Sequence, residues 1–267
     1  MTRGRAIATT DSPRRRGLLF DLTRCIGCRS CMHGCRHAND LPIPAPDATP
    51  PEELDGDNFT AVLPHEDDDA GTVYFRRLCM HCADPACVSA CPVHALAKRD
   101  DGAVVYDRDL CIGCRYCFVA CPFHVPTYTW TRTAPVVRKC FLCAHRLDAG
   151  QIPGCAAACP TGATVFGPRD VLLHLAREQI AAHPDRYVDH ILGEHEAGGT
   201  DVLMIASIPF ADLGIWTDVI ERPLPELTWM VQEKIPYVIG TGGLLLGGLY
   251  WVINRRMRLG REGGEES

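Results

Sequence analysis

The sequence predicts an α+β protein that is organised around metal sites and ends in a single transmembrane helix. Two observations lead to this fold class. Sixteen cysteines occur among the 267 residues, in four groups of four that long cysteine-free stretches separate. Near the C-terminus, residues 235–253 form an uncharged and largely apolar stretch. The chain also contains 24 Gly and 20 Pro, which favours a loop-rich structure over an ordinary hydrophobic core.

Composition and motif content exclude several function classes. The chain has a net charge of −6, whereas a nucleic-acid-binding protein normally presents a strongly basic face. We therefore expect no nucleic-acid partner. The sequence contains no HExxH, Gly-x-Ser-x-Gly, Walker or dinucleotide-binding motif. We therefore expect no catalytic site on this chain, and we expect another subunit to handle any substrate.

The N-terminal arm, residues 1–17, is polar and contains three consecutive arginines from Arg14. A twin-arginine export signal requires a continuous apolar region after its arginines. Only three apolar residues, Leu18–Phe20, follow before the chain becomes polar again. We therefore expect no cleavable signal in this segment.

The cysteines follow a regular spacing within each group. The four motifs are Cys25-x2-Cys28-x2-Cys31-x3-Cys35, Cys79-x2-Cys82-x4-Cys87-x3-Cys91, Cys111-x2-Cys114-x2-Cys117-x3-Cys121 and Cys140-x2-Cys143-x11-Cys155-x3-Cys159. The second, third and fourth motifs end in Cys-Pro, whereas Arg36 follows the first motif. The second and third motifs thus form an internal repeat.

This spacing is typical of [4Fe–4S] clusters. In bacterial ferredoxins the run C-x2-C-x2-C-x3-C-P binds one cluster with its first three cysteines, and its fourth cysteine binds the other cluster of a pair. Three thiolates at two-residue spacing can reach three irons of one cubane, while the fourth, on the next helical turn, points toward a second cubane. Four such motifs predict four [4Fe–4S] clusters in two pairs.

Zinc and disulfides are the alternatives. Structural zinc is usually held by two well-separated Cys-x2-Cys pairs, and three cysteines at successive two-residue spacings would crowd one ion. A zinc-stabilised assembly module without an electron-transfer role is nevertheless kept as an alternative. Disulfides between thiols this close in sequence would require many small strained loops.

Local patterns predict the elements between and after the motifs. Residues 41–71 are rich in proline and end in an acidic run, so we expect a surface loop. Gly102–Tyr106 predicts a short strand before the third motif, and Gly162–Phe166 a strand after the fourth. Pro168–Ala182 has helical apolar spacing and Val202–Ile208 is β-prone, and we interpret both as packing elements.

Four histidines lie among the cysteines: His33, His81, His124 and His145. Sixteen thiolates already suffice as ligands, so we expect these histidines on the surface or in packing. One or two of them could tune a reduction potential through hydrogen bonds to cluster sulfurs.

The apolar stretch 235–253 is near the length that crosses a bilayer as a helix. Aromatic residues typical of the membrane interface flank it: Trp229, Tyr237, Tyr250 and Trp251. Its glycines, which include a GxxxG at Gly243 and Gly247, disfavour an isolated soluble helix but allow close approach of a neighbouring membrane helix. A buried core helix is the alternative.

Charges around this stretch predict an orientation. Four arginines follow it: Arg255, Arg256, Arg258 and Arg261. Before it, Lys234 stands beside Glu233. The positive-inside rule therefore predicts a single-pass cell-membrane protein whose C-terminus is cytoplasmic and whose cysteine motifs lie on the periplasmic side.

Three stretches carry a family resemblance: Cys79–Leu96, Tyr106–Tyr128 and Arg138–Gly167. They resemble the four-cluster ferredoxin-type electron-transfer subunits of membrane-bound respiratory oxidoreductases, in particular those of the HybA type in periplasmic uptake hydrogenase-2 complexes. Gly198–Pro209 and the C-terminal helix are similar too. The β subunits of formate dehydrogenase share CIGC at Cys25–Cys28, CPTGA at Cys159–Ala163 and the terminal helix. The resemblance covers residues 18–255.

The resemblance implies two ferredoxin-like double-cluster domains, one inserted in the other. Motifs one and four would form one domain, and motifs two and three the inserted domain. The implied ligand sets are Cys25, Cys28, Cys31 and Cys159; Cys35, Cys140, Cys143 and Cys155; Cys79, Cys82, Cys87 and Cys121; and Cys91, Cys111, Cys114 and Cys117.

The resemblance also implies a division of the chain. After the arm, residues 18–40 and 136–215 would form the first ferredoxin-like unit with a C-terminal extension. The remaining segments would be the surface loop 41–71, the inserted unit 72–135, a linker 216–234, the transmembrane helix 235–254 and a cytoplasmic tail 255–267.

Similar subunits pass single electrons between a catalytic subunit and a multi-helix quinone-reactive membrane subunit. The catalytic partner implied by the resemblance is a NiFe hydrogenase. A molybdopterin enzyme such as formate dehydrogenase is the alternative. Formate dehydrogenase β subunits lack an export signal and leave the cytoplasm with a signal-bearing partner, which the missing apolar region after Arg16 would allow here.

Overall fold

The computed structural model describes residues 15–45, 48–129, 136–214 and 219–262. Helices and strands are mixed in these residues, which confirms the α+β class. The chain divides into two units, one up to Leu224 that contains all sixteen cysteines and one from Pro225 onward. Most of the expected N-terminal arm, residues 1–14, and the end of the expected tail, residues 263–267, lie outside the described residues.

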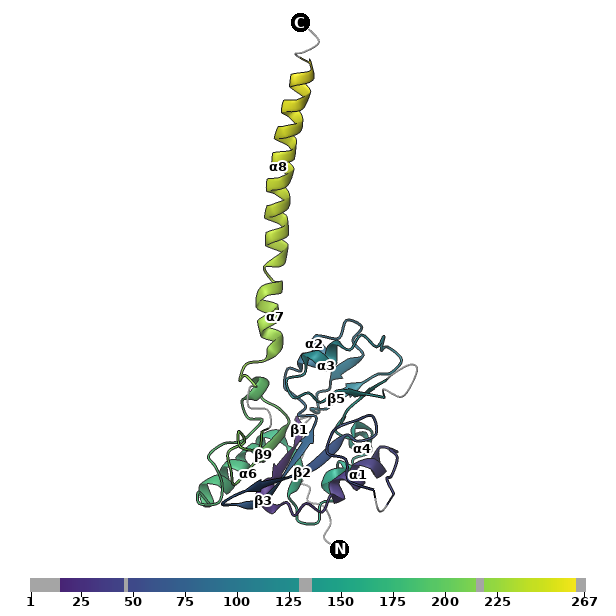
Figure 1. Ribbon diagram of the computed structural model, residues 1–267, viewed down its shortest axis with the longest axis vertical. Coiled ribbons are helices and arrows are strands. Elements are labelled where there is room, and N and C mark those ends of the chain that lie inside the picture. The colour runs from purple at the N-terminus through teal and green to yellow at the C-terminus, as the bar shows by residue number, and fades with distance from the viewer. Residues whose placement is uncertain (1–14, 46–47, 130–135, 215–218, 263–267) are drawn as a thin grey trace. The chain divides into compact units, whose positions relative to one another are not determined.

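A three-stranded sheet forms the centre of the first unit (Figure 1). Its middle strand β1 (Arg16–Asp21) pairs antiparallel with β8 (Thr164–Pro168) and parallel with β9 (Val202–Ile205). The sequence pattern does not predict β1, because a short strand buried on both faces shows no alternation. β1 directly precedes the first cysteine motif and β8 follows the fourth, so the sheet brings these two motifs together.

The two faces of this sheet have different neighbours. On one face, Leu19 packs with Leu172, Ala176 and Ile180 of α6 (Arg169–Ala182). On the other face, Phe20 belongs to the same buried cluster as several cysteines of motifs one and four. The expected strand after motif four, the helix near 168–182 and the β-prone segment near 202 are therefore confirmed.

Short helices contain the cysteines of motifs one and four or lie directly beside them. They are the 3-10 helix η1 (Leu22–Arg24), α1 (Ser30–Ala38), α4 (Ala144–Asp148) and α5 (Gly154–Ala157). Motifs two and three are carried by α2 (Ala86–Ser89) and α3 (Tyr116–Ala120). A further 3-10 helix, η2, spans Glu196–Gly198.

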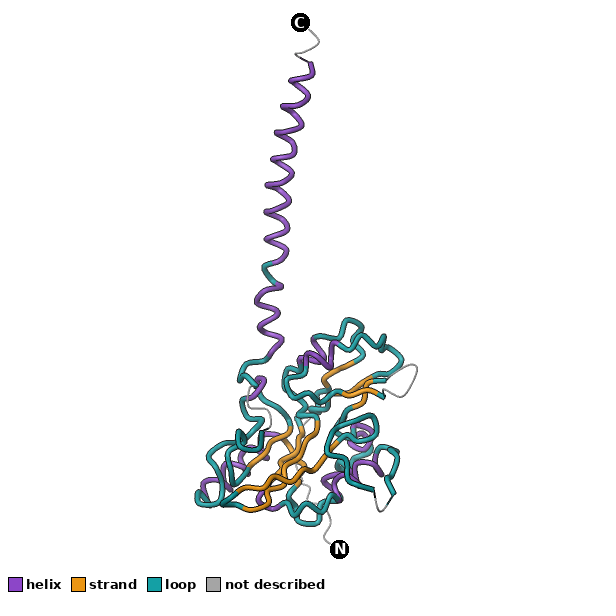
Figure 2. The backbone as a smooth tube through the Cα atoms, in the orientation of Figure 1, coloured by secondary structure: helices purple, strands orange, loops and turns teal. Residues whose placement is uncertain are grey.

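Small two-stranded sheets complete the first unit, and Figure 2 shows their strands in orange. β4 (Leu96–Lys98) pairs with β5 (Val104–Tyr106), which confirms the strand expected before the third motif. β6 (Thr127–Tyr128) pairs with β7 (Val137–Arg138). The loop between β6 and β7 includes residues 130–135, at the end of the expected inserted unit, which lie outside the described residues.

The expectation of a loop over residues 41–71 is wrong for its second half. Residues 60–67 form β2 (Thr60–Asp67), which pairs along its whole length with β3 (Gly71–Leu78). Pro64 is tolerated because β2 has a partner on one side only. The acidic run closes the hairpin, since the Asp67 carboxylate accepts backbone N–H bonds from Asp69 and Ala70.

The second unit consists of two helices. α7 (Leu224–Gln232) occupies part of the expected linker, and α8 (Ile235–Glu262) continues well past the expected end of the membrane helix at residue 254. Within the described residues, one stretch, Leu224–Met257, is long and apolar enough to cross a membrane, and none of its best apolar window is buried in the protein. Within its own unit, this helix is therefore not a buried core helix.

Candidate functional site

Each cysteine motif begins with the same backbone turn. The residue before the second cysteine has a positive φ in all four motifs: Gly27 (66°), His81 (50°), Gly113 (72°) and Leu142 (55°). This turn directs a backbone N–H toward the first sulfur. The N–H of Gly113 lies 3.4 Å from the sulfur of Cys111, and that of Leu142 lies 3.4 Å from the sulfur of Cys140. Such N–H groups stabilise sulfur in its thiolate form.

Proline sets the length of the helices after these turns. α2, α3 and α5 have four or five residues and end before the Cys-Pro steps at Pro92, Pro122 and Pro160, because proline disfavours the helical conformation of the preceding residue. Arg36 replaces proline after the first motif, and α1 continues to Ala38. Cys35 therefore lies inside a helix rather than after one.

The helices pair as the motif order requires. α1 of motif one packs against α5 of motif four, and α2 of motif two packs against α3 of motif three. The α1–α5 crossing is close, since both helices have a glycine at the contact, Gly34 and Gly154. The fourth cysteine of each motif consequently lies near the first three of the partner motif.

The sixteen sulfurs are free thiols that influence one another's ionisation in four sets. We name them set A (Cys25, Cys28, Cys31, Cys159), set B (Cys35, Cys140, Cys143, Cys155), set C (Cys79, Cys82, Cys87, Cys121) and set D (Cys91, Cys111, Cys114, Cys117). The four thiols of set D line one apolar cavity together with Leu96, Tyr106 and Tyr128.

Thiols of neighbouring sets also affect one another's pKa. Cys155 of set B raises the pKa of Cys31 in set A, and Cys79 of set C raises that of Cys140 in set B. In the same way, Cys117 of set D raises the pKa of Cys87 in set C. These three couplings link the sets in the order A, B, C and D, and we call this order the row.

Most of these thiols resist ionisation when no metal is bound. Burial raises the pKa of Cys31 to about 11 and that of Cys87 to about 12, and neighbouring cysteines contribute to both shifts. Cys159 differs, because backbone N–H groups of Thr164, Ala163 and Thr161 and the Thr161 hydroxyl lower its pKa despite its burial. Iron would relieve the mutual repulsion of gathered thiolates, since metal binding favours the deprotonated ligand.

Exposure distinguishes the ends of the row from its middle. All eight thiols of sets B and C are buried, whereas Cys28 of set A and Cys114 of set D are exposed. An exposed isoleucine lies two residues before each of these exposed thiols. Ile26 is 61% exposed beside Cys28, and Ile112 is 66% exposed beside Cys114.

Of the four histidines, only His81 is buried. Its Nδ1 accepts the backbone N–H of Val104 at 3.0 Å, so the ring proton is on Nε2. Among the described residues, Nε2 has no partner. Burial, together with the charges of Lys139 and Lys98, holds the pKa of His81 well below its usual value. A neutral N–H donor without a partner between Cys79 and Cys82 fits a sulfur-rich group bound there.

Three polar residues near the thiols do not follow from the cysteine spacing. The amide of Asn39 lies 3.5 Å from the sulfur of Cys35 and 3.7 Å from that of Cys143. Arg76 and Lys139 are buried beside the sets. A local signal existed for two of them, because Asn39 is one helical turn after Cys35 and Lys139 directly precedes Cys140.

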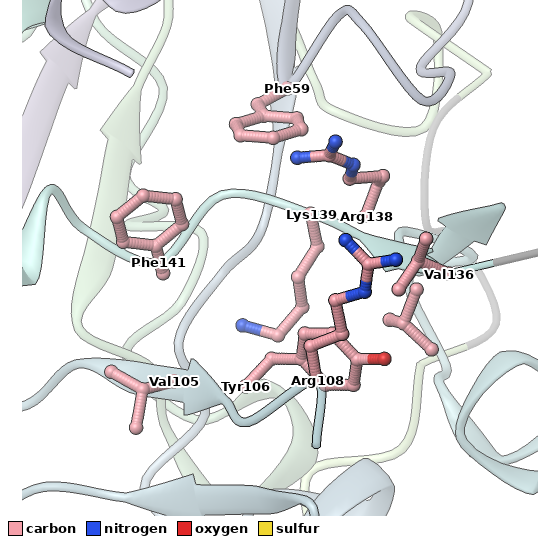
Figure 3. Close-up of a pocket in the computed structure, with 9 residues that line it drawn as sticks. Phe59, Val105, Tyr106, Arg108, Val136, Arg138, Lys139 and Phe141 are labelled. Carbon is pink, nitrogen blue, oxygen red and sulfur yellow. The ribbon is translucent and has the colours of Figure 1, made fainter. Parts of the chain in front are cut away.

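A cavity of about 360 Å³ lies between β5, β7 and the segment that leads into motif four (Figure 3). Phe59 and Phe141 form one side, with ring centroids 6.1 Å apart in an edge-to-face arrangement. Figure 3 shows the Lys139 amine turned away from the guanidinium groups of Arg108 and Arg138. The cavity therefore combines aromatic walls with two guanidinium groups.

The donor set suits a metal cluster better than a single ion. Among the described residues, no three Cys, His, Asp or Glu side chains converge closely enough to hold one metal ion. A cubane spreads its four thiolate ligands over a larger volume. The four thiol sets, the cavity that the thiols of set D line and the unpartnered His81 N–H together fit [4Fe–4S] clusters.

Comparisons with known proteins point the same way. Residues 70–169 match the family model of a 4Fe-4S dicluster domain. The hydrogenase-2 operon protein HybA of Escherichia coli O157:H7 is 33% identical over an alignment 292 residues long, and this alignment covers 91% of this chain and 85% of HybA. A protein of Nitratidesulfovibrio vulgaris is 40% identical over 254 residues, covering 92% of this chain and 69% of that protein.

A second group of relatives comes from another enzyme class. The iron–sulfur subunit of the nitrate-inducible formate dehydrogenase of Escherichia coli K12 is 33% identical over 197 residues. The match covers 70% of this chain and 66% of that subunit. Similarity thus extends across iron–sulfur subunits that work with different catalytic partners.

Proposed function

The chain belongs to the family of ferredoxin-type iron–sulfur subunits of oxidoreductase complexes, and we propose that it relays single electrons through four [4Fe–4S] clusters. The observation that carries this proposal is the gathering of sixteen free cysteines into four thiol sets in a row. When bound, such clusters supply reversible one-electron sites. The chain itself is a non-catalytic subunit.

In this proposal each set holds one cluster. Cys25, Cys28, Cys31 and Cys159 would hold the first, and Cys35, Cys140, Cys143 and Cys155 the second. Cys79, Cys82, Cys87 and Cys121 would hold the third, and Cys91, Cys111, Cys114 and Cys117 the fourth. The helix pairs α1–α5 and α2–α3 support this assignment, as do the mutual effects of the thiols within each set.

The same pairing supports two ferredoxin-like domains, with residues 72–135 inserted between the two parts of the first. β1 and β8 join the segments on either side of the insertion. Within the insertion, β4 and β5 connect motif two to motif three. Each domain would then hold two clusters, sets A and B in one and sets C and D in the other.

Exposure supports a relay with an entry and an exit. The buried sets B and C would exchange electrons only with their neighbours in the row. Sets A and D each have an exposed thiol beside exposed apolar side chains, so a partner protein could approach either end. Burial keeps water from the thiols of the two inner sets.

We propose a catalytic subunit at one end and a quinone-reactive membrane subunit at the other. A NiFe hydrogenase is the favoured catalytic partner, because the HybA match covers most of both chains. A molybdopterin enzyme is the second candidate, because the formate dehydrogenase subunit covers 70% of this chain. Purification of the native complex in mild detergent, with its subunits identified, tests the proposal. A complex without any redox enzyme would contradict it.

We propose that α8 anchors the chain in the membrane with its C-terminus in the cytoplasm. The helix is apolar and fully unburied within the chain, and arginines follow its apolar part from Arg255. A membrane-impermeant thiol reagent applied to intact spheroplasts tests the orientation. Labelling of a cysteine introduced at Asp212, an exposed position of the cluster unit, is expected, and complete protection would contradict the periplasmic location.

A further inference from the structure

Two buried cations lie between the thiol sets without a carboxylate partner. Arg76 is 1% exposed and Lys139 is 4% exposed. Among the residues that the structure describes, neither forms an ion pair with Asp or Glu. Burying a charge is costly unless an opposite charge and hydrogen bonds offset the lost hydration. The offsetting negative charge must therefore come from another source.

Arg76 lies where sets A and B meet. It is on β3, and its Nε donates to the Thr60 hydroxyl at 2.7 Å, while Nη1 donates to the Thr164 hydroxyl at 3.3 Å. Both acceptors are neutral. Burial alone would lower the pKa of the guanidinium, but Cys155, Cys31 and Cys35 raise it above its usual value. The groups whose ionisation would supply negative charge to Arg76 are thus Cys31 of set A and Cys35 and Cys155 of set B.

Lys139 lies where sets B and C meet. Its amine donates to the backbone carbonyls of Val104 and Cys140, the second at 2.9 Å. Cys140 belongs to set B. Burial raises the pKa of Cys87 and that of Cys121, both in set C, and the charge of Lys139 partly offsets both shifts. Neutral carbonyls hold the amine in place, and the thiolates of two sets supply the negative charge.

We infer that Arg76 and Lys139 are fixed counter-charges at the A–B and B–C junctions, which raise the reduction potentials of the clusters on either side. This inference rests on the proposed clusters. Four thiolates and a [4Fe–4S] core carry net negative charge, and reduction adds one more electron without breaking a bond. A permanent cation at short range stabilises the reduced form more than the oxidised form, and net charge is one of the factors that set such potentials.

The arrangement has a functional consequence. Sets B and C are buried and have no solvent to stabilise an added electron. Without a counter-charge the reduction potentials of the clusters in sets B and C would lie below those of the clusters in sets A and D. The middle of the row would then be a barrier to electron transfer. Arg76 and Lys139 act as positioning residues, because their fixed charges keep the inner clusters accessible to electrons.

The test is an EPR-monitored redox titration of the purified full-length chain or its complex. Signals are first assigned to sets with the single variants Cys28→Ser, Cys35→Ser, Cys82→Ser and Cys114→Ser. Arg76→Gln is then expected to lower the potentials of sets A and B by at least 59 mV, a tenfold change in a one-electron equilibrium, and to leave set D unchanged. Lys139→Gln is expected to lower the reduction potentials of the clusters in sets B and C in the same way.

Matched variants separate charge from shape. Arg76→Lys and Lys139→Arg keep the charge and are expected to keep wild-type potentials. Arg177→Gln removes an exposed arginine that pairs with Glu194 on the surface, and it is expected to change none of the reduction potentials. Unchanged potentials in iron-loaded Arg76→Gln and Lys139→Gln would overturn the inference.

Iron content decides the case in which a glutamine variant loses its clusters. If the charge-keeping variants retain iron, the charge is needed to hold an anionic group, which supports the inference. If they lose iron as well, side-chain shape is responsible and the inference is wrong. Wild-type protein without four clusters would instead contradict the proposed function, so the two failures are distinguishable.

Discussion

Gly34 and Gly154 face each other where α1 crosses α5. A Cβ atom on Gly34 would lie 2.5 Å from the carbonyl oxygen of Gly154 and 2.6 Å from the Cβ of Ala158. A Cβ on Gly154 would lie 2.6 Å from the Cβ of Ala38. Neither position has room for a side chain, so the helices of motifs one and four pack backbone against backbone.

Substitution of Gly34 tests this crossing. We expect Gly34→Val to destabilise the cluster unit by about 1–3 kcal/mol, because overpacking forces the two helices apart. Sets A and B should lose iron, while sets C and D, on α2 and α3, should keep it. Iron analysis and EPR of the purified protein measure this. His33→Ala changes an exposed residue of the same helix and should retain all its iron. Full iron in Gly34→Val would refute the tight crossing.

Asp201 joins distant parts of the first unit through a cluster of cations. Its carboxylate is fully buried and pairs with Arg15 at 2.7 Å and Lys98 at 2.6 Å, and Arg169 lies 3.8 Å away. Lys98 is in the segment between motifs two and three, and Arg15 directly precedes β1. Burial lowers the pKa of Lys98, and Asp201 partly offsets that effect.

Removing this carboxylate leaves three partly exposed cations without their counter-charge. We expect Asp201→Asn to destabilise the unit by about 1.5–3 kcal/mol, the usual range for loss of hydrogen bonds to a charged group. Thermal unfolding followed by circular dichroism should show a clearly lower midpoint. Asp212→Asn alters an exposed carboxylate near the same strand and serves as control. Equal midpoints for the two variants would show that the ion pairs do not hold these segments together.

The exposed thiols of sets A and D predict the order of oxidative damage. Oxidants reach Cys28 and Cys114 directly, whereas every thiol of sets B and C is buried. During controlled treatment with ferricyanide we expect the EPR signals of sets A and D to disappear first. Set-specific serine variants identify each signal. Earlier loss of the signals of set B or set C would contradict the proposed order of the row.

The apolar part of α8 predicts membrane retention. Leu245, near its middle, is 75% exposed within the chain. We expect Leu245→Arg to weaken membrane insertion, because a central arginine disfavours insertion by about 2.5–3.5 kcal/mol. Alkaline carbonate extraction should release more of this variant than of the wild type. Gln232→Arg, before the apolar part, should remain in the membrane fraction. Equal retention of both variants would argue against a spanning helix.

Local sequence patterns predict part of this structure well. Motif spacing predicts the helical turn between the third and fourth cysteines of each motif, since this spacing acts within a few residues. Helix α6 and strand β8 are likewise evident from apolar periodicity near Pro168. The expected linker, by contrast, contains α7. This helix is not predicted because Pro223, rather than a Ser, Thr, Asp or Asn cap, directly precedes its five apolar residues.

Long-range burial is what the sequence does not reveal. Arg76 and Arg77 are neighbours on β3 and point to opposite faces, yet only Arg76 is buried. Nothing local distinguishes the two, because the burial of Arg76 depends on Thr60, Thr164 and the cysteines of two distant motifs. Strand β1 likewise could not be predicted from local sequence, since its partners β8 and β9 lie over 140 residues away.

Metal and acid-labile sulfide analysis of the purified full-length chain tests the central claim most directly. Four [4Fe–4S] clusters require about sixteen iron ions and as many sulfide ions per chain, and we predict both values with no stoichiometric zinc. Stoichiometric zinc without sulfide would contradict the account and favour a zinc-stabilised structural module on the same cysteines.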